Sequence, residues 1–410
     1  MTKTVGTVRP VARGLVLLGP AFVAAIAYVD PGNVAANLTG GARYGYLLVW
    51  VLVAANLMAA FIQYQSAKLG LVSGRTMPEL LGDRLKPASR RLFWAQAELV
   101  AAATDLAEVI GGAIALNLLF GLPLVFGGLI VGAVSMALLA LQSRYGQRPF
   151  ESVIIGLLAI IAIGFLAGLF VTPPDGAAVV AGLVPRFEGT GSVLLAASML
   201  GATVMPHAIY VHSALVRDRH GRGETALRRK RLLRATKWDV AIALGIAGVV
   251  NIGMLLLAAV NLRGVGNTDS IINAHAAIRA DLGSGIALAF AIGLLASGLA
   301  STSVGSYAGA TIMAGLLKRR YPVFLRRVVT LIPALVILVL AIDPTWALVV
   351  SQVFLSFGIP FALIPLLRLT NDRTVMGEHA NRRPVRLLLS LIAVLVVALN
   401  LALIVRTILG

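Results

Sequence analysis

Two short stretches place polar side chains in the middle of long apolar runs. The first is Asp30-Pro31-Gly32-Asn33, in a run that extends from Gly14 to about Leu38. Because proline lacks a backbone N–H and glycine is conformationally free, a helix is expected to unwind at this point. A carboxylate, a side-chain amide and unpaired carbonyls brought together would suit a cation.

The second stretch is Ala202-Thr203-Val204-Met205-Pro206-His207, where Pro206 again interrupts an apolar run. Here the side chain that could bind a metal is the thioether of Met205. A thioether adds little for calcium or magnesium, which prefer oxygen ligands, and more for softer divalent ions. Isolated prolines are often simple kinks, but two breaks that both carry ligands favour a binding site.

Together the two breaks predict a mixed oxygen and sulfur site for a divalent cation. Its side chains would be Asp30, Asn33 and Met205, and the unwound backbone near Ala27 and Ala202 could add carbonyl oxygens. This combination favours manganese, iron, cadmium or cobalt over the alkaline-earth ions.

Three carboxylates follow one another along a single apolar segment. Glu98, Asp105 and Glu108 are spaced by seven and three residues, which places them on one face of a helix. Carboxylates inside a membrane are costly unless paired or protonated, and such series are typical of proton relays. Arg326 and Arg327 are the expected countercharges.

Other ionisable residues receive simpler interpretations. His207 adjoins the second break, which favours a gate or relay role, whereas the spacing of His212 is poor for a shared metal and indicates a structural role. Glu151 and Asp239 are expected to stabilise helix N-termini. The remaining histidines fall in loops or at span ends and receive no role: His220, His275 and His379.

The composition indicates the class of protein in which these residues occur. The 410 residues are 59% hydrophobic and only 13% charged, with a mean hydropathy of +0.91. Soluble domains are about 45–50% apolar and about 25% charged, so the chain is predicted to be an all-α polytopic membrane protein. No cleavable signal peptide is expected. The absence of cysteine excludes disulfides and thiolate metal sites.

Eleven apolar segments are long enough to cross a bilayer, which takes about 20 residues. Two of them, 13–40 and 192–216, contain the breaks and stand five spans apart. Matching interruptions in two halves of a transporter point to a site at the interface of inverted repeats. We therefore expect one domain with repeats at 13–171 and 192–368 and an additional helix at 385–408. The other spans are 46–70, 91–120, 123–142, 150–171, 238–261, 284–316, 324–342 and 345–368.

The basic residues orient these spans. With the N-terminus inside, alternate connections hold 30 of the 35 Lys and Arg residues, and this asymmetry indicates cytoplasmic loops. The net charge of +18 therefore reflects topology, and no nucleic-acid partner is expected. The C-terminus would lie outside. The basic stretch 217–237 is expected to form a short amphipathic helix at the lipid headgroups.

The two breaks resemble the signatures of Nramp divalent-metal transporters, a family that includes bacterial manganese transporters. The likeness extends over nearly the whole chain. It includes Gly40-Gly41-Ala42-Arg43-Tyr44-Gly45, Ala103-Thr104-Asp105-Leu106-Ala107-Glu108 and Ser351-Gln352. Related magnesium transporters are expected to lack the methionine at the second break, so Met205 argues against that branch.

The resemblance implies a LeuT-like fold of five plus five helices with an eleventh helix, in the inner (plasma) membrane. It implies import of Mn²⁺ or Fe²⁺ together with H⁺, without a prosthetic group. Metal ligands would be Asp30, Asn33, Met205 and the carbonyls of Ala27 and Ala202, with Gln352 joining on closure of the outer side. Protons would pass from Asp30 through His207 and Asp105 towards Glu98, Glu108, Arg326 and Arg327.

Three alternatives remain open at this point. An amino-acid or amine carrier of the same architecture is disfavoured because Asp30 would repel a substrate carboxylate. An intramembrane metalloprotease would need a cluster such as His-Glu-x-x-His, which the sequence lacks. A channel without alternating access is harder to exclude. The oligomeric state is also open, with a monomer as one option.

Overall fold

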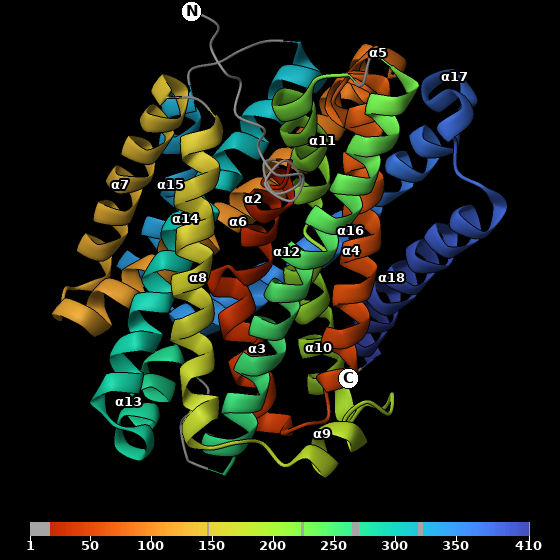
Figure 1. Ribbon diagram of the computed structural model, residues 1–410. Coiled ribbons are helices and arrows are strands. Elements are labelled where there is room, and N and C mark those ends of the chain that lie inside the picture. Colours follow the sequence, from red (N-terminus) through yellow and green to blue (C-terminus); the bar gives the residue numbers. More distant parts are fainter. Residues whose placement is uncertain (1–16, 146, 223–224, 265–269, 319–322, 410) are drawn as a thin grey trace, which may run out of the picture.

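The computed structural model describes residues 17–145, 147–222, 225–264, 270–318 and 323–409. Within the stretches 138–147, 323–326 and 406–409 it describes only the backbone. Over these ranges the chain is a bundle of helices without a strand (Figure 1). This confirms the predicted all-α class.

Eight apolar helices in the described ranges are long enough to cross a membrane, counting the interrupted pair α10–α11 as one. They are α4 (Val49–Ser73), α6 (Pro87–Phe120), α8 (Gln147–Val171), α10 (Gly189–Thr203) with α11 (Pro206–His220), α12 (Ala226–Asn261), α14 (Ser284–Leu317), α16 (Pro344–Asn371) and α18 (Arg383–Leu409). Three further apolar helices are described with side chains over fewer than 18 residues: α2 (Pro20–Ile26) with η1 (Ala27–Val29), α7 (Leu124–Tyr145) and α15 (Val323–Val339). The second half of the first span is α3 (Pro31–Tyr44).

Short helices lie at the two ends of the bundle. Figure 1 shows α5 (Met77–Arg84) and α17 (Arg373–Met376) at one end, and α9 (Gly176–Ala181) and α13 (Ile271–Leu282) at the other. Helices α5 and α17 lie in two of the connections that are rich in Lys and Arg. Ion pairs join its elements: Arg84 with Asp372 at 2.6 Å, Arg217 with Glu79 at 2.7 Å and Lys318 with Asp83 at 2.7 Å.

The prediction of a separate amphipathic helix within residues 217–237 was wrong. Helix α12 begins at Ala226, so most of the basic stretch forms its first turns, where the Thr225 hydroxyl accepts a hydrogen bond from Arg228 N at 3.2 Å. Residues 226–244 contain neither glycine nor proline, and Leu, Arg, Lys and Ala are good helix formers. Nothing in this stretch therefore interrupts the helix before it reaches the apolar segment.

The first break differs in detail from the prediction. Ala27–Val29 form one turn of 3-10 helix, Asp30 is extended, and α3 already begins at Pro31, so Gly32 is helical. Proline is well placed at the first position of a helix, where its missing N–H would have had no partner. The polar signature therefore caps and starts the second half-helix, and the 3-10 turn precedes it.

The two interrupted helices lie in the interior of the bundle. α3 packs against α12, α11 against α4, and α10 against α16, while α6 and α14 form a long contact with each other. Almost all residues from Pro20 to Ala42 and from Ser192 to Val216 are buried. The breaks are thus surrounded by protein, which is the condition under which unwound backbone is tolerated in a membrane.

Candidate functional site

The second break lies where the sequence predicts it. Helix α10 ends at Thr203, Val204 and Met205 leave the helical conformation, and α11 starts at Pro206. Met205 is extended and occupies the N-cap position of α11, just as Asp30 does for α3. Each second half-helix therefore begins with a proline at its first position, directly after a candidate metal ligand.

The side chains of Asp30 and Asn33 connect the two breaks. Asn33 donates from its backbone N (2.9 Å) and its Nδ2 (2.7 Å) to Asp30 Oδ1. The same Nδ2 donates to the carbonyl of Ala202 at 2.9 Å. Asp30 and Asn33 are completely buried. The carboxylate is therefore held by its own helix terminus, and the amide reaches across to the second break.

Gln352 of α16 lies against both breaks. Its Nε2 is 3.5 Å from Asp30 Oδ2, and a Cβ atom on Gly32 would collide with its amide. A Cβ on Gly201 would collide with the Gln352 backbone carbonyl. Gly201 is therefore required by the close approach of the α16 backbone, whereas at Gly32 the obstacle is the Gln352 side chain. The structure thus brings Gln352 together with Asp30 and with the end of α10.

Two polar side chains that sequence reasoning missed bind the unwound backbone. Asn251 Nδ2 of α12 donates to the Tyr28 carbonyl at 2.7 Å, and Ser297 Oγ of α14 donates to the Val29 carbonyl at 2.6 Å. Both are buried polar residues in apolar helices, and this was the available sequence signal. They hold the irregular segment in one conformation, since buried carbonyls require donors.

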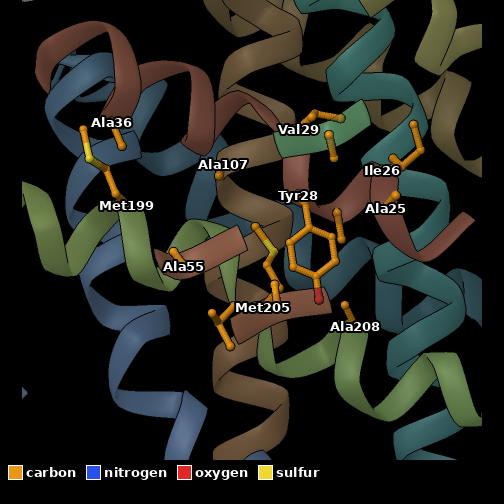
Figure 2. Packing of buried hydrophobic residues seen from close by; sticks show 14 of the residues in the cluster. Ala25, Ile26, Tyr28, Val29, Ala36, Ala55, Ala107, Met199, Met205 and Ala208 are labelled. Carbon is orange, nitrogen blue, oxygen red and sulfur yellow. The ribbon is translucent and has the colours of Figure 1, made fainter. Parts of the chain in front are cut away.

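Several acceptors at the junction are buried and have no hydrogen-bond partner among the described residues: Asn33 Oδ1, Gln352 Oε1 and Thr203 Oγ1. The thioether of Met205 is fully buried, and Figure 2 shows it in the same cluster as Tyr28. Ala27 begins η1, next to these groups in the chain. The junction thus contains the Asp30 carboxylate and two unpaired amide oxygens, and the Met205 thioether follows three residues after Ala202 in the chain. The described ranges contain no group of three or more His, Cys, Asp or Glu side chains suited to a metal.

The three carboxylates of α6 lie in two different environments. Asp105 and Glu108 are buried, and both approach Gly305 of α14: a Cβ there would lie 3.0 Å from Glu108 Oε1 and 3.5 Å from Asp105 Oδ1. Asp105 Oδ1 forms an ion pair with Arg327 Nη1 at 2.9 Å. Glu98 instead borders a groove at the bundle surface. The side chain of Arg326 lies outside the described residues.

The two histidines of α11 have different neighbours. His207 Nδ1 lies 3.3 Å from the hydroxyl of Thr104, the residue before Asp105. His212 Nδ1 lies 2.7 Å from Gln63 Oε1, and Gln63 Nε2 donates to the Tyr28 hydroxyl. His207 therefore adjoins the buried carboxylates, and His212 belongs to a buried chain of side chains that reaches the first break through α4. Sequence reasoning missed Gln63 and Tyr28.

The prediction that Asp239 stabilises the start of its own helix was wrong. Asp239 lies well inside α12, and its carboxylate accepts hydrogen bonds from Gly19 N (3.0 Å) and Ala21 N (2.9 Å). It therefore caps α2, a different helix, because the longer α12 carries it to that helix's N-terminus. Glu151, near the start of α8, forms an ion pair with Arg219 at 3.3 Å.

The family model described as "Natural resistance-associated macrophage protein-like" (Nramp) matches residues 21–406, which include both breaks, α16 and α6. The chain belongs to the Nramp family. An Nramp relative from Mycobacterium tuberculosis, the "Divalent metal cation transporter MntH", is 60% identical over 394 residues, covering 96% of this chain and 92% of the relative.

Solved structures agree with this placement of the Nramp chain. A crystal structure of the Eremococcus coleocola manganese transporter superposes with a TM-score of 0.86 at 31% identity, covering 98% of this chain and 88% of that one. MhsT in complex with L-phenylalanine shares the fold alone, with a TM-score of 0.58 at 13% identity, covering 94% of this chain and 98% of the other. This Nramp protein is a membrane transporter and not an enzyme.

Proposed function

We propose that the protein imports divalent transition-metal ions together with protons by alternating access. The substrates would be Mn²⁺ and Fe²⁺, with Cd²⁺ and Co²⁺ also accepted. The observation that carries the proposal is the buried junction of two interrupted helices, which holds the Asp30 carboxylate and unpaired amide oxygens and has the buried Met205 thioether at the N-cap of its second half-helix. Relatives named as divalent metal cation transporters support it.

In this proposal Asp30, Asn33, Met205 and Gln352 bind the substrate ion, with the carbonyls of Ala27 and Ala202. The Ala202 carbonyl accepts a hydrogen bond from Asn33 Nδ2. Rotation of the Asn33 amide would release that carbonyl and turn Oδ1, which has no partner, towards the ion. The substrate ion would thus replace the hydrogen bond between Asn33 and Ala202. Its binding would therefore be coupled to the relative position of the two interrupted helices.

The helix contacts support five plus five inverted repeats with α18 as an eleventh helix. The first repeat would run from α2 to α8 and the second from α10 to α16. If the repeats are related in this way, each contact between two helices should recur between their equivalents in the other repeat. The α3–α12 contact recurs as α11–α4, and the α10–α16 contact recurs as α2–α8. The α6–α16 contact likewise recurs as α14–α8. Such repeats place the substrate site between them.

We further propose that the α5–α17 end of the bundle faces the cytoplasm in the inner (plasma) membrane, with the N-terminus inside and the C-terminus outside. The asymmetric distribution of Lys and Arg supports this orientation. An inside-negative potential would then favour import, because moving one charge across 100 mV is worth about 2.3 kcal/mol and a divalent ion gains twice that.

The proton route proposed from the sequence leads from Asp30 through His207 to Asp105, and on to Glu98, Glu108, Arg326 and Arg327. The His207–Thr104 contact next to Asp105 and the Asp105–Arg327 ion pair support its middle section. Arg327 Nε also donates to Ser135 Oγ at 3.1 Å, which fixes the guanidinium beside the carboxylates. Chains of carboxylates within membrane spans commonly mark proton relays.

The decisive experiment is metal uptake into proteoliposomes. We expect saturable Mn²⁺ uptake that an acid-outside gradient stimulates, and that Fe²⁺, Cd²⁺ and Co²⁺ inhibit by competition. A radiolabelled amino acid should not enter. A steep temperature dependence is expected for alternating access and would separate it from a channel. Mn²⁺ uptake no greater than in empty liposomes would refute the proposal.

Met205→Ala tests the role of the sulfur in selectivity. We expect Mn²⁺ uptake to persist in part while Ca²⁺ and Mg²⁺ become better competitors, because the remaining ligands are oxygens that hard ions accept. The measurement is the inhibition constant of each ion against Mn²⁺ uptake. Met199→Ala is the matched control, since Met199 is equally buried in α10 but lies against Gly40 of α3; Figure 2 shows it apart from Met205. Unchanged selectivity in Met205→Ala would exclude the thioether as the filter.

Asp105→Asn tests the proposed proton route. We expect the variant to bind Mn²⁺ but to lose the stimulation of uptake by an acid-outside gradient. Because the change leaves Arg327 without its partner, the double variant Asp105→Asn with Arg327→Leu removes both buried charges and protects against misfolding. Uptake is measured with and without the gradient, and normal stimulation in both folded variants would contradict the route.

Asp83→Asn is the control for that experiment. Asp83 lies on α5 outside the spans, and hydrogen bonds from Lys318 and Arg75 lower the pKa of its carboxyl to about 2. This carboxylate therefore stays ionised throughout the pH range of a transport assay. Its replacement should leave the dependence of uptake on the proton gradient unchanged.

A further inference from the structure

A groove of about 1130 Å³ opens on the bundle surface between α6, α14 and α15. Helix α15 packs along α6 and α7 but scarcely touches α14, which leaves the space between α14 and α15 open. Apolar residues from all three helices line one part of the groove: Leu99, Ala102, Met313, Val329 and Pro333. Leu99 and Val329 are more than half exposed, so the groove is open towards the surrounding lipid.

The polar groups of the groove gather at one end. Arg90 and Arg91 begin this wall at the start of α6, and the indole of Trp94 follows one turn later. Arg90 Nε and Trp94 Nε1 have no hydrogen-bond partner among the described residues, although an Arg90 Nη1 donates to the Gly82 carbonyl at 3.4 Å. This end of the groove therefore presents two cations, and two buried N–H donors in its wall lack an acceptor among the described residues.

We propose that this groove binds one anionic glycerophospholipid. Its phosphate would lie at Arg90 and Arg91, an ester or phosphate oxygen would accept from Trp94 after a small rotation of the indole, and an acyl chain would lie along the apolar walls. Basic pockets between transmembrane helices bind anionic headgroups in this way, and tryptophan is favoured at the headgroup level.

The acidic residue of the groove is compatible with this ligand. Glu98 lies seven residues after Arg91, which places it about 10 Å further along the helix. This separation keeps the carboxylate away from the position proposed for the phosphate. The inference extends beyond the proposed metal transport and does not depend on it, because lipid binding can be measured without metal or gradient.

The test is native mass spectrometry of the delipidated full chain in neutral detergent, titrated with phosphatidylglycerol or with phosphatidylcholine of the same acyl chains. We expect the wild type to retain one phosphatidylglycerol in preference to phosphatidylcholine. Arg90→Gln with Arg91→Gln should weaken phosphatidylglycerol binding about thirty-fold, the effect of two basic side chains near a membrane surface. Equal retention of both lipids by the wild type would overturn the proposal.

Two further variants separate a defined site from general surface charge. Ala95→Trp would fill the groove and leave both arginines in place, so it should also abolish selective retention. The control is Arg382→Gln with Arg383→Gln, an exposed pair of adjacent arginines at the start of α18, and it should retain the lipid. If the control loses phosphatidylglycerol as strongly as the Arg90 and Arg91 variant, or if Ala95→Trp retains it, the groove is not the site.

Discussion

Replacement of Asp30 by asparagine is expected to reduce Mn²⁺ binding and uptake by at least about 100-fold. Loss of a residue that only hydrogen-bonds to a metal ligand already lowers metal affinity by about 10- to 100-fold, and Asp30 is proposed to be a ligand itself. The variant should fold. Asp30 Oδ1 caps α3 by accepting from Asn33 N, and asparagine is an equally good N-cap residue that keeps this oxygen. What is lost is the carboxylate that directly precedes α3 at the first break.

The loss can be measured by Mn²⁺ uptake in proteoliposomes and by calorimetric Mn²⁺ binding, with the melting temperature as a check on folding. The chain offers a closely matched control in Asp343, which also caps a helix that begins with proline, at Pro344, but is exposed at the end of α16. Asp343→Asn should transport normally. If folded Asp30→Asn bound Mn²⁺ as tightly as the wild type, the proposed site would be wrong.

The second large effect is expected from Gly201→Ala. A Cβ at this position would meet the carbonyl oxygen of Gln352 and would lie 2.8 Å from the backbone N of Ser356. Because both obstacles are backbone atoms of α16, no side-chain rotation can relieve the collision. Overpacking of this kind costs about 1–3 kcal/mol, and here it must separate α10 from α16. We therefore expect a marked loss of stability and no transport.

Thermal unfolding monitored by size-exclusion chromatography would measure this loss, alongside Mn²⁺ uptake. Gly245→Ala in α12 is the matched control, since nothing lies within 4 Å of a Cβ added there and alanine is the better helix former. It should be neutral or stabilising. A Gly201→Ala protein with normal stability and uptake would show that α10 and α16 need not approach so closely during transport.

Local physics explains why the breaks could be predicted from the sequence. Proline removes a backbone donor and favours the first position of a helix wherever it occurs, so Pro31 and Pro206 mark the starts of half-helices without reference to the rest of the chain. The same holds for the apolar lengths of the spans. The resemblance to a family added Gln352, which no local pattern would have singled out.

Contacts between distant segments could not be predicted in this way. Asn251 and Ser297 bind the carbonyls of Tyr28 and Val29 across more than 200 residues of chain, and Asp239 caps a helix that is not its own. A lone polar residue in an apolar helix signals that a partner is needed, but the partner depends on which helices pack together.

The sequence by itself therefore determined the membrane class, the two interrupted helices and the residue types at the junction, because each follows from the preferences of neighbouring residues. Only the tertiary structure decided which oxygens remain unpaired, how Gln352 reaches both breaks, and which helix each buried polar group serves. Those outcomes depend on close packing, where a small residue such as Gly201 allows two helices to approach closely.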